Sequence, residues 1–264
     1  MEACLQGTVT TDREDLYDLR YFYVDERGIG HYACGVAFES MMSIFRQHRF
    51  NKFCGHEWYS AVKRSSENPV VQGFLAEHIC LNHIFTHGLQ VVDGRLGRMD
   101  QASFETLPNW DYMLWSDKEL CLYVPTNYNF RAVDGAILLL DHSAKIAHLF
   151  LLQITLSMRH KESDKDFYSN MWFEWVESIE TAGFTVESTF VWIDKKQPST
   201  QTEPVLTRTL RSGTKIVRPE YCSTHVGIGQ VDERLAVVLG LSCKPFFKLP
   251  LFGHNFQSRK NRSE

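Results

Sequence analysis

Two continuous apolar runs dominate the middle of the sequence and predict its central strands. Residues 137–140 and 149–156 have the length of strands and lack the alternation of a half-exposed strand, which indicates burial on both faces. Asp134 stands just before the first run, and Gln153 and Thr155 interrupt the second. Because Gln153 and Thr155 are two residues apart, the strand period places both on one face of the sheet.

These polar side chains predict a functional site on that face. An amide or hydroxyl group that is buried without a hydrogen-bond partner costs roughly 1–3 kcal/mol, so a folded protein must satisfy such groups. Asp134 brings a carboxylate to the start of the first buried strand, facing the polar pair of the next one. We therefore expect Asp134, Gln153 and Thr155 to share one polar pocket.

A long helix over residues 69–87 is expected before these strands. Pro69 stands in its first turn and Gly88 just past its end, which are the positions where these residues are enriched. Glu77 falls within the apolar stripe of this helix, where a carboxylate needs a counter-charge, a proton or a cation. Two interpretations stay open: Glu77 is a functional carboxylate, or it lies at the margin of the stripe and reaches water.

The order of the elements predicts an α/β fold. The expected elements follow one another as a helix at 69–87, strands at 120–124, 137–140 and 149–156, a helix at 163–181 and a strand at 185–193. The long segment 89–117 reads as a connection with irregular structure. An α-β-β-β-α-β order predicts a mixed central sheet flanked by helices.

Three regions are expected along the chain. They are an N-terminal extension at 1–65, a core at 66–205 and a C-terminal extension at 206–264. The first holds a predicted hairpin of strands 21–24 and 29–32, followed by a helix after Gly35. The last holds a predicted strand at 214–217, a helix near 231–239 and a basic tail.

Composition narrows the function classes. The net charge of −4 argues against a broad nucleic-acid-coating surface, although short basic clusters could still hold a few phosphates. Seven scattered cysteines form no disulfide framework, which indicates reduced thiols and an intracellular protein. No apolar run approaches the roughly 18 residues of a membrane span, and residues 1–20 lack the pattern of a signal peptide. We therefore expect no membrane partner.

Two other chemistries have weak support. Cys34 precedes a predicted helix, where a thiol pKa can be lowered, but no recognisable surround of a cysteine hydrolase accompanies it, and a buried structural cysteine fits better. His83 and His87 have the spacing of two metal ligands on a helix. No further Cys or His pair at a standard spacing completes a tetrahedral zinc set, so a zinc site is not favoured.

Several short motifs, in order, resemble the restriction-endonuclease-like (PD-(D/E)xK) nuclease fold. The resemblance is closest to the nuclease domains of Crinkler-type effectors and retrotransposon-hot-spot-like proteins of fungi, oomycetes and trypanosomes, and it spans about residues 20–195. It rests on Gly73-Phe-Leu-Ala-Glu77, Tyr123-Val-Pro, Asn129-Phe130, Val133-Asp134, Leu152-Gln-Ile-Thr155 and His160. The segments 21–25 and 31–35 resemble the linker that precedes such domains.

The resemblance implies a metal-dependent nuclease. It assigns Glu77, Asp134 and Gln153 as ligands of Mg²⁺ or Mn²⁺, which prefer oxygen donors. The family pattern has a lysine where this chain has Thr155, so the positive group beside the phosphate would come from His160 or Lys161. The implied function is phosphodiester hydrolysis, with DNA rather than RNA as the expected substrate. The alternative is a degenerate nuclease fold that acts as an effector by binding nucleic acid or a host protein.

The resemblance also bears on partners and location. The chain contains no P-loop sequence, so an ATPase module, if the gene product has one, is expected upstream or on another chain. The expected location is intracellular, in the nucleus, or inside a host cell if the protein is an exported effector.

Overall fold

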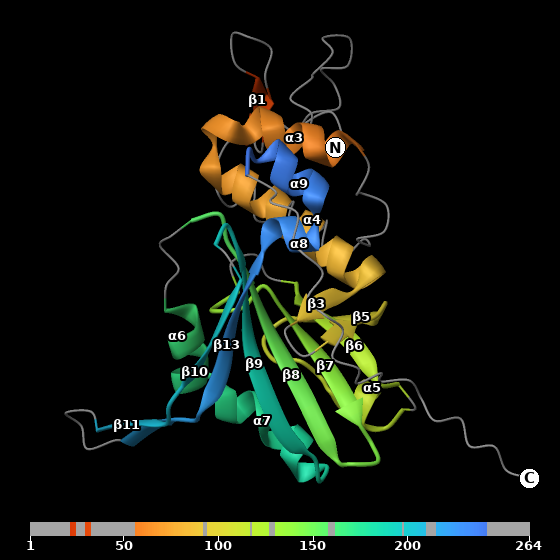
Figure 1. The fold of residues 1–264 in the computed structure, drawn as a ribbon, viewed down its shortest axis with the longest axis vertical. Coiled ribbons are helices and arrows are strands. Elements are labelled where there is room, and N and C mark those ends of the chain that lie inside the picture. Colours follow the sequence, from red (N-terminus) through yellow and green to blue (C-terminus); the bar gives the residue numbers. More distant parts are fainter. Residues whose placement is uncertain are drawn as a thin grey trace, which may run out of the picture.

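The centre of the molecule is a seven-stranded mixed sheet with the strand order β10-β13-β9-β8-β7-β6-β5 (Figure 1). The computed structural model describes residues 22–24, 30–32, 56–91, 94–116, 118–126, 130–157, 162–196, 198–209 and 215–241. The strands of the sheet are β5 (Asp100–Phe104), β6 (Leu120–Pro125), β7 (Gly135–Asp141), β8 (Ile146–Ile154), β9 (Thr185–Asp194), β10 (Ser199–Glu203) and β13 (Tyr221–Gly227). Adjacent strands β8, β9 and β13 are parallel, whereas β7 is antiparallel to both β6 and β8.

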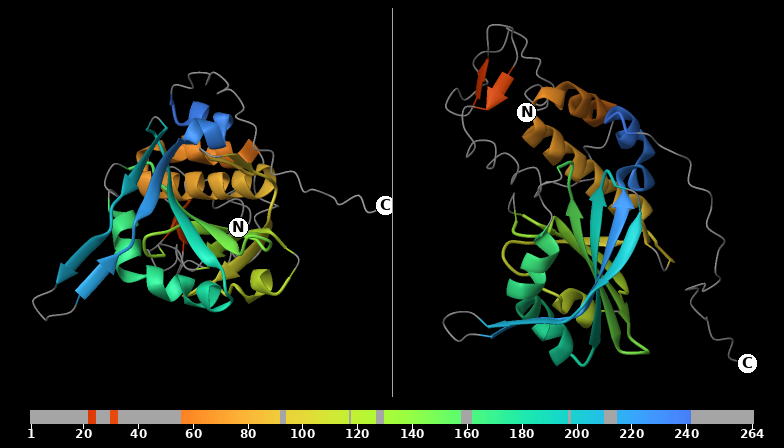
Figure 2. Two further views of the ribbon diagram at one scale, coloured as in Figure 1. Left: turned by 60° about the horizontal axis from the view of Figure 1, so that its bottom comes forward. Right: turned by 60° about the vertical axis from the view of Figure 1, so that its left-hand side comes forward.

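Helices cover both faces of this sheet (Figure 2). On one face lie α3 (His56–Arg64), the 3₁₀ helix η3 (Ser65–Glu67), α4 (Pro69–His87), α8 (Ile228–Val231) and α9 (Glu233–Val238). On the other lie α5 (Asp111–Leu114), α6 (Ser163–Asn170) and α7 (Trp172–Thr181). Each layer of helices buries its own hydrophobic core against the sheet. The expected α/β class, with a mixed sheet flanked by helices, is confirmed.

Three two-stranded hairpins complete the described structure. They are β1 (Phe22–Val24) with β2 (Gly30–Tyr32), β3 (Leu89–Val91) with β4 (Gly94–Leu96), and β11 (Leu206–Thr209) with β12 (Lys215–Arg218), all antiparallel. The β11–β12 hairpin projects from the body of the protein (Figure 1). The helix predicted after Gly35 and the basic tail lie outside the described residues.

The two apolar runs form neighbouring inner strands, as their sequence predicts. In β8, Leu149 and Leu151 pack into the core under α6 and α7, whereas Leu152 and Ile154 pack into the core under α4. Alternate residues of one strand therefore enter two different cores, which explains why the run is continuous rather than alternating.

Helix α4 begins and ends where Pro69 and Gly88 predict. The Asn68 side chain accepts a hydrogen bond from the Val71 N–H at 3.3 Å, Pro69 occupies the first turn, and Gly88 follows the last residue with φ +84°. A side chain at position 88 would collide with the Leu96 carbonyl, because an ideal Cβ would lie 1.8 Å from that oxygen. The glycine is thus required by both its conformation and its surroundings.

The structure departs from the predicted elements in three places. The single helix expected over 163–181 is two helices, because Met171 leaves the helical region at φ −121° and ψ −24°. The expected irregular segment 89–117 contains the β3–β4 hairpin, α5 and strand β5 of the main sheet. Strands β10, β11 and β13 have no counterpart among the predictions, although β10 and β13 belong to the main sheet. Within the described ranges, no helix is both long and apolar enough to cross a membrane.

Candidate functional site

Asp134 and Gln153 meet at the end of the sheet where β8 finishes. Gly135 pairs with Leu152, so Asp134 stands opposite Gln153. The Asp134 Oδ2 atom accepts hydrogen bonds from Gln153 Nε2 at 2.7 Å and from the Ile154 backbone N–H at 2.6 Å. The prediction that Asp134 and Gln153 lie together is confirmed, whereas their role stays a prediction.

The surroundings of this pair hold its carboxylate in one orientation. Gln153 is only 8% exposed and shares the strand parity of Leu149 and Leu151, so it faces the α6–α7 side. Asp134 is half-buried, and two N–H groups donate to one of its oxygens. Hydrogen bonds to a carboxylate are stronger than those between neutral groups, which favours a fixed side chain.

Contrary to the prediction, Thr155 does not join this pair. Its backbone N–H continues the sheet by donating to the Ile193 carbonyl at 3.0 Å. Its hydroxyl group instead donates to the Ser157 carbonyl and accepts from the Ser157 N–H, both at 3.0 Å. These local bonds form a turn that ends β8 at Ile154, and they direct the Thr155 side chain to an adjacent cavity.

Glu77 lies on the helix that covers the other face of the sheet. It is 8% exposed, and its Oε1 atom is 4.0 Å from His78 Nδ1. One turn further along α4, Leu81 Cδ2 lies 3.2 Å from the place where a Cβ on Gly135 would be. The right view of Figure 2 shows α4 crossing the end of the sheet where β8, β9 and β13 finish. Glu77 therefore belongs to the same end of the sheet as Asp134, on the opposite face.

The remaining residues that the sequence singled out are either outside the described ranges or on helix α4. His160, Lys161 and Cys34 lie outside the described residues. The rings of His83 and His87 lie side by side, with 4.3 Å between their centroids. In the part of the chain that the structure describes, no three His, Cys, Asp or Glu side chains are grouped so that they could hold a metal ion.

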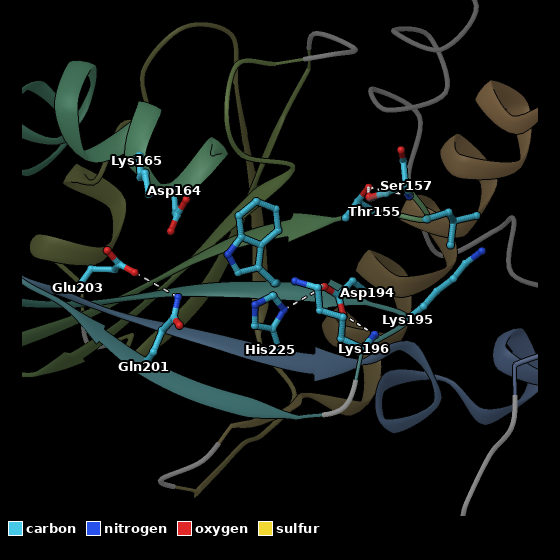
Figure 3. A pocket seen from close by; sticks show the side chains of 12 residues that line it. Thr155, Ser157, Asp164, Lys165, Asp194, Lys195, Lys196, Gln201, Glu203 and His225 are labelled. Carbon is cyan, nitrogen blue, oxygen red and sulfur yellow. Dashed lines mark hydrogen bonds and ion pairs between the residues drawn. The ribbon is translucent and has the colours of Figure 1, made fainter. Parts of the chain in front are cut away.

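A cavity of about 270 Å³ opens beside Thr155 (Figure 3). Its walls come from the carboxyl ends of β8, β9 and β13, from the start of α6 and from β10. The carboxyl ends of parallel strands are the usual location of ligand sites in open α/β sheets. The cavity therefore extends the candidate site beyond the Asp134–Gln153 pair.

An aspartate and a histidine are joined across two parallel strands of this cavity. His225 Nδ1 and Asp194 Oδ2 are 2.9 Å apart, and Asp194 Oδ1 accepts from the Lys196 N–H at 2.7 Å. The His225 ring stacks on Trp192, with an interplanar angle of 13° and 6.0 Å between centroids. Both rings contribute to the lining of the cavity.

Asp164 brings a buried carboxylate to the same cavity. It is 4% exposed, and its Oδ2 atom accepts a hydrogen bond from the Tyr221 hydroxyl at 2.9 Å. Burial and the nearby Asp164 charge raise the pKa of Tyr221, so this phenol stays a neutral donor. The Asp164 Oδ1 atom is buried and has no hydrogen-bond partner.

Sequence reasoning missed these cavity residues for different reasons. Asp164 resembles an ordinary acidic residue in the first turn of a helix. Asp194 directly follows a predicted strand, and the rule about carboxyl ends of strands could have found it. His225 lies in β13, whose alternation of polar and apolar residues is too irregular to predict a strand.

Comparisons of the chain with protein-family models, with curated proteins and with solved structures find no match. The function must therefore be argued from the geometry and chemistry of the site.

Proposed function

We propose that this chain is a Mg²⁺- or Mn²⁺-dependent nuclease with a restriction-endonuclease-like core, and that it hydrolyses phosphodiester bonds in DNA. The observation that carries the proposal is the hydrogen-bonded pair of Asp134 and Gln153 at the end of a mixed sheet. The elements α4, β6, β7, β8, α6–α7 and β9 follow the α-β-β-β-α-β order of that fold, with the β3–β4 hairpin, β5 and α5 inserted between α4 and β6. An oriented carboxylate can supply an oxygen ligand, which is the type of ligand that a hard cation prefers.

The donor types fit magnesium or manganese better than zinc. Asp134 offers a carboxylate and Gln153 offers an amide oxygen once its side-chain amide is turned, whereas Glu77 lies on the opposite face of the sheet and is not brought together with them. Magnesium sites commonly use one or two carboxylates, with water and substrate phosphate as the other ligands. When bound, such a cation neutralises charge on the phosphate and promotes ionisation of a water molecule.

The chain's own residues would orient the substrate. The Ile154 N–H donates to Asp134 Oδ2 at 2.6 Å, and this backbone bond keeps the direction of the carboxylate even when the Gln153 amide is turned. Thr155 cannot supply the positive charge of the family lysine, but Lys195 and Lys196 follow β9 and line the cavity beside Thr155. Both lysines are exposed, and Lys196 Nζ lies 3.8 Å from Asp194 Oδ2. His160 and Lys161, the other proposed positive groups, lie outside the described residues.

Cleavage assays with an Asp134→Asn variant test this function. We expect the native chain to cleave DNA with magnesium or manganese, and the variant to lose at least roughly 100-fold in rate, because even outer-shell changes cost 10–100-fold at metal sites. Asp141→Asn is the matched control, since Asp141 ends the same strand β7 on the side away from the pair. Equal cleavage by native protein and Asp134→Asn would show that the assignment is wrong.

One observation favours a second function, in which the fold binds nucleic acid or a host protein without cutting. The Asp134 oxygen already accepts two hydrogen bonds, and Thr155 replaces the lysine of the family pattern. A carboxylate that is satisfied in this way also suits a structural role. Salt-dependent binding of DNA or RNA, without cleavage under any metal condition, would favour this second function over the nuclease.

A further inference from the structure

Asp164, which lines the cavity beside Thr155, has a buried carboxylate oxygen without a hydrogen-bond partner. Asp164 Oδ1 has no partner although the residue is 4% exposed. The other acidic side chains of the cavity are paired: Asp194 with His225 at 2.9 Å, and Glu203 with Arg218 at 3.6 Å. A buried acceptor without a donor is costly, so a ligand that donates a hydrogen bond at this point gains affinity.

Charge is distributed unevenly along the cavity. In Figure 3, Asp164 lies at one end, and Lys195 and Lys196 lie at the other, with His225 between them. Lys165 lies next to Asp164 on α6, but it is exposed and its Nζ atom is 3.9 Å from Glu162. A ligand that fits this arrangement carries an N–H donor at one end and a negative charge at the other.

Size and shape restrict the ligand further. The volume of about 270 Å³ is at the lower end of the roughly 300–1,000 Å³ of small-molecule pockets. It suits one nucleotide and excludes a base-paired duplex. Trp192 and His225 place aromatic rings in the lining of the cavity, and planar bases pack well against aromatic side chains.

We propose that this cavity binds a single unpaired nucleobase that carries an exocyclic amino group, next to the phosphate on which the chain acts. This proposal rests on the proposed nucleic-acid function and specifies its substrate. The amino group donates to Asp164 Oδ1, and the adjoining phosphate lies toward Lys195 and Lys196. Thr155 lines this cavity and is two residues from Gln153, so the bound nucleotide adjoins the Asp134–Gln153 pair.

The carboxylate discriminates between bases through its charge. Cytosine and adenine present an amino donor at the edge that a pocket reads, whereas thymine presents carbonyl oxygens on both sides of its N–H. Asp164 Oδ2 is already bonded to Tyr221, so only Oδ1 is available, and a thymine carbonyl would be pressed against a negative group. We therefore expect cytosine to bind better than thymine, two bases of similar size.

Binding of oligo-deoxycytidine and oligo-deoxythymidine to the full chain tests the pocket. Fluorescence anisotropy in EDTA measures affinity while metal-dependent cleavage is prevented. We expect the native chain to bind the cytidine oligomer roughly 10-fold more tightly, the scale of one hydrogen bond to a charged group. In Asp164→Asn the side-chain amide can accept from Tyr221 and donate into the cavity, so the preference should reverse toward thymidine.

Glu174→Gln is the matched control. Glu174 is an exposed carboxylate in the first turn of the next helix, α7, and does not line the cavity, so its substitution should leave the cytidine preference unchanged. Equal affinity of the native chain for the two oligomers would overturn the proposed base pocket. This comparison requires no variant. A folded Asp164→Asn with the native preference would also overturn it.

The same samples test the proposed base pocket and the proposed nuclease activity independently. Cleavage with magnesium but without base preference in binding would overturn the pocket and support the nuclease. A cytidine preference that Asp164→Asn reverses, without cleavage under any metal condition, would support the pocket and overturn the nuclease.

Discussion

Arg131 binds Asp166 with two parallel hydrogen bonds, and this pair links the two parts of the candidate site. Arg131 Nε donates to Asp166 Oδ2 at 2.7 Å, and a terminal guanidinium nitrogen donates to Oδ1 at 2.6 Å. Arg131 lies three residues before Asp134, and Asp166 lies two residues after Asp164. The guanidinium therefore holds the segment before β7 against helix α6, the helix that carries Asp164.

The first prediction concerns the strength of this link. The Arg131 side chain is 63% exposed, so the pair should contribute only about 0.5–1 kcal/mol to the free energy of unfolding despite its two-point geometry. A double-mutant cycle with Arg131→Ala and Asp166→Ala, followed by urea unfolding, measures this coupling. Strictly additive effects of the two substitutions would show that the pair does not fix the segment.

The second prediction is the pH dependence of the same pair. The bond from Arg131 lowers the pKa of Asp166 below its ordinary value, so the folded protein binds a proton there less readily than the unfolded chain does. The pair's contribution to stability is thus fully present above the unfolded pKa of about 3.9 and is lost as the pH falls through the lower folded pKa. Urea unfolding of native protein and Arg131→Ala from neutral to acidic pH should show the two stabilities converging at low pH. A constant difference across this range would contradict the prediction.

The sequence was most informative where local pattern determines structure. The bounds of α4 follow from Pro69 and Gly88, and the meeting of Asp134 with Gln153 follows from two neighbouring strands whose polar residues share a face. These features depend on residues close in the chain, or on strands joined by a short turn.

The missed features depend on contacts between distant segments. The cavity forms because β13 pairs with β9, and the sequence of residues 221–227 does not predict that pairing. The turn at Thr155 was missed because a threonine after an apolar run also suits a continuing strand. The break at Met171 was missed because the apolar spacing of helices α6 and α7 continues across it, with Met171 and Trp175 still bonded to the preceding turn.

The third prediction compares two glycines that differ in their surroundings. An alanine at Gly135 would place its Cβ 3.2 Å from Leu81 Cδ2 and 3.3 Å from the Tyr123 carbonyl oxygen, which belongs to the backbone of the neighbouring strand and has little room to move. We expect Gly135→Ala to lower the free energy of unfolding by about 1–3 kcal/mol, the usual cost of overpacking. Gly73→Ala is the matched comparison, because Gly73 lies inside α4 with no atom within 4 Å of the added Cβ, and it should stabilise by about 0.5–1 kcal/mol. Urea unfolding of both variants measures these two opposite changes in the free energy of unfolding. Equal changes would contradict the close contacts inferred at Gly135.

The last prediction concerns how an acidic chain holds a polyanion. The net charge of −4 gives no general attraction for nucleic acid, so binding must depend on a few local cations. Lys195 and Lys196 lie together at the proposed phosphate end of the cavity, and each contact that neutralises a phosphate steepens the dependence of affinity on salt. We expect the double variant Lys195→Gln, Lys196→Gln to bind both oligomers more weakly and to the same extent. It should also reduce the slope of log affinity against log salt by about 0.7 per lost contact on single strands.

Lys145→Gln is the control, because Lys145 is exposed at the turn between β7 and β8, at the opposite end of the sheet. Fluorescence anisotropy across a salt series measures both slopes, and an equal reduction by the control would mean that the attraction is not local. A loss confined to the cytidine oligomer would contradict the assignment of these lysines to the phosphate, since a phosphate contact cannot distinguish one base from another.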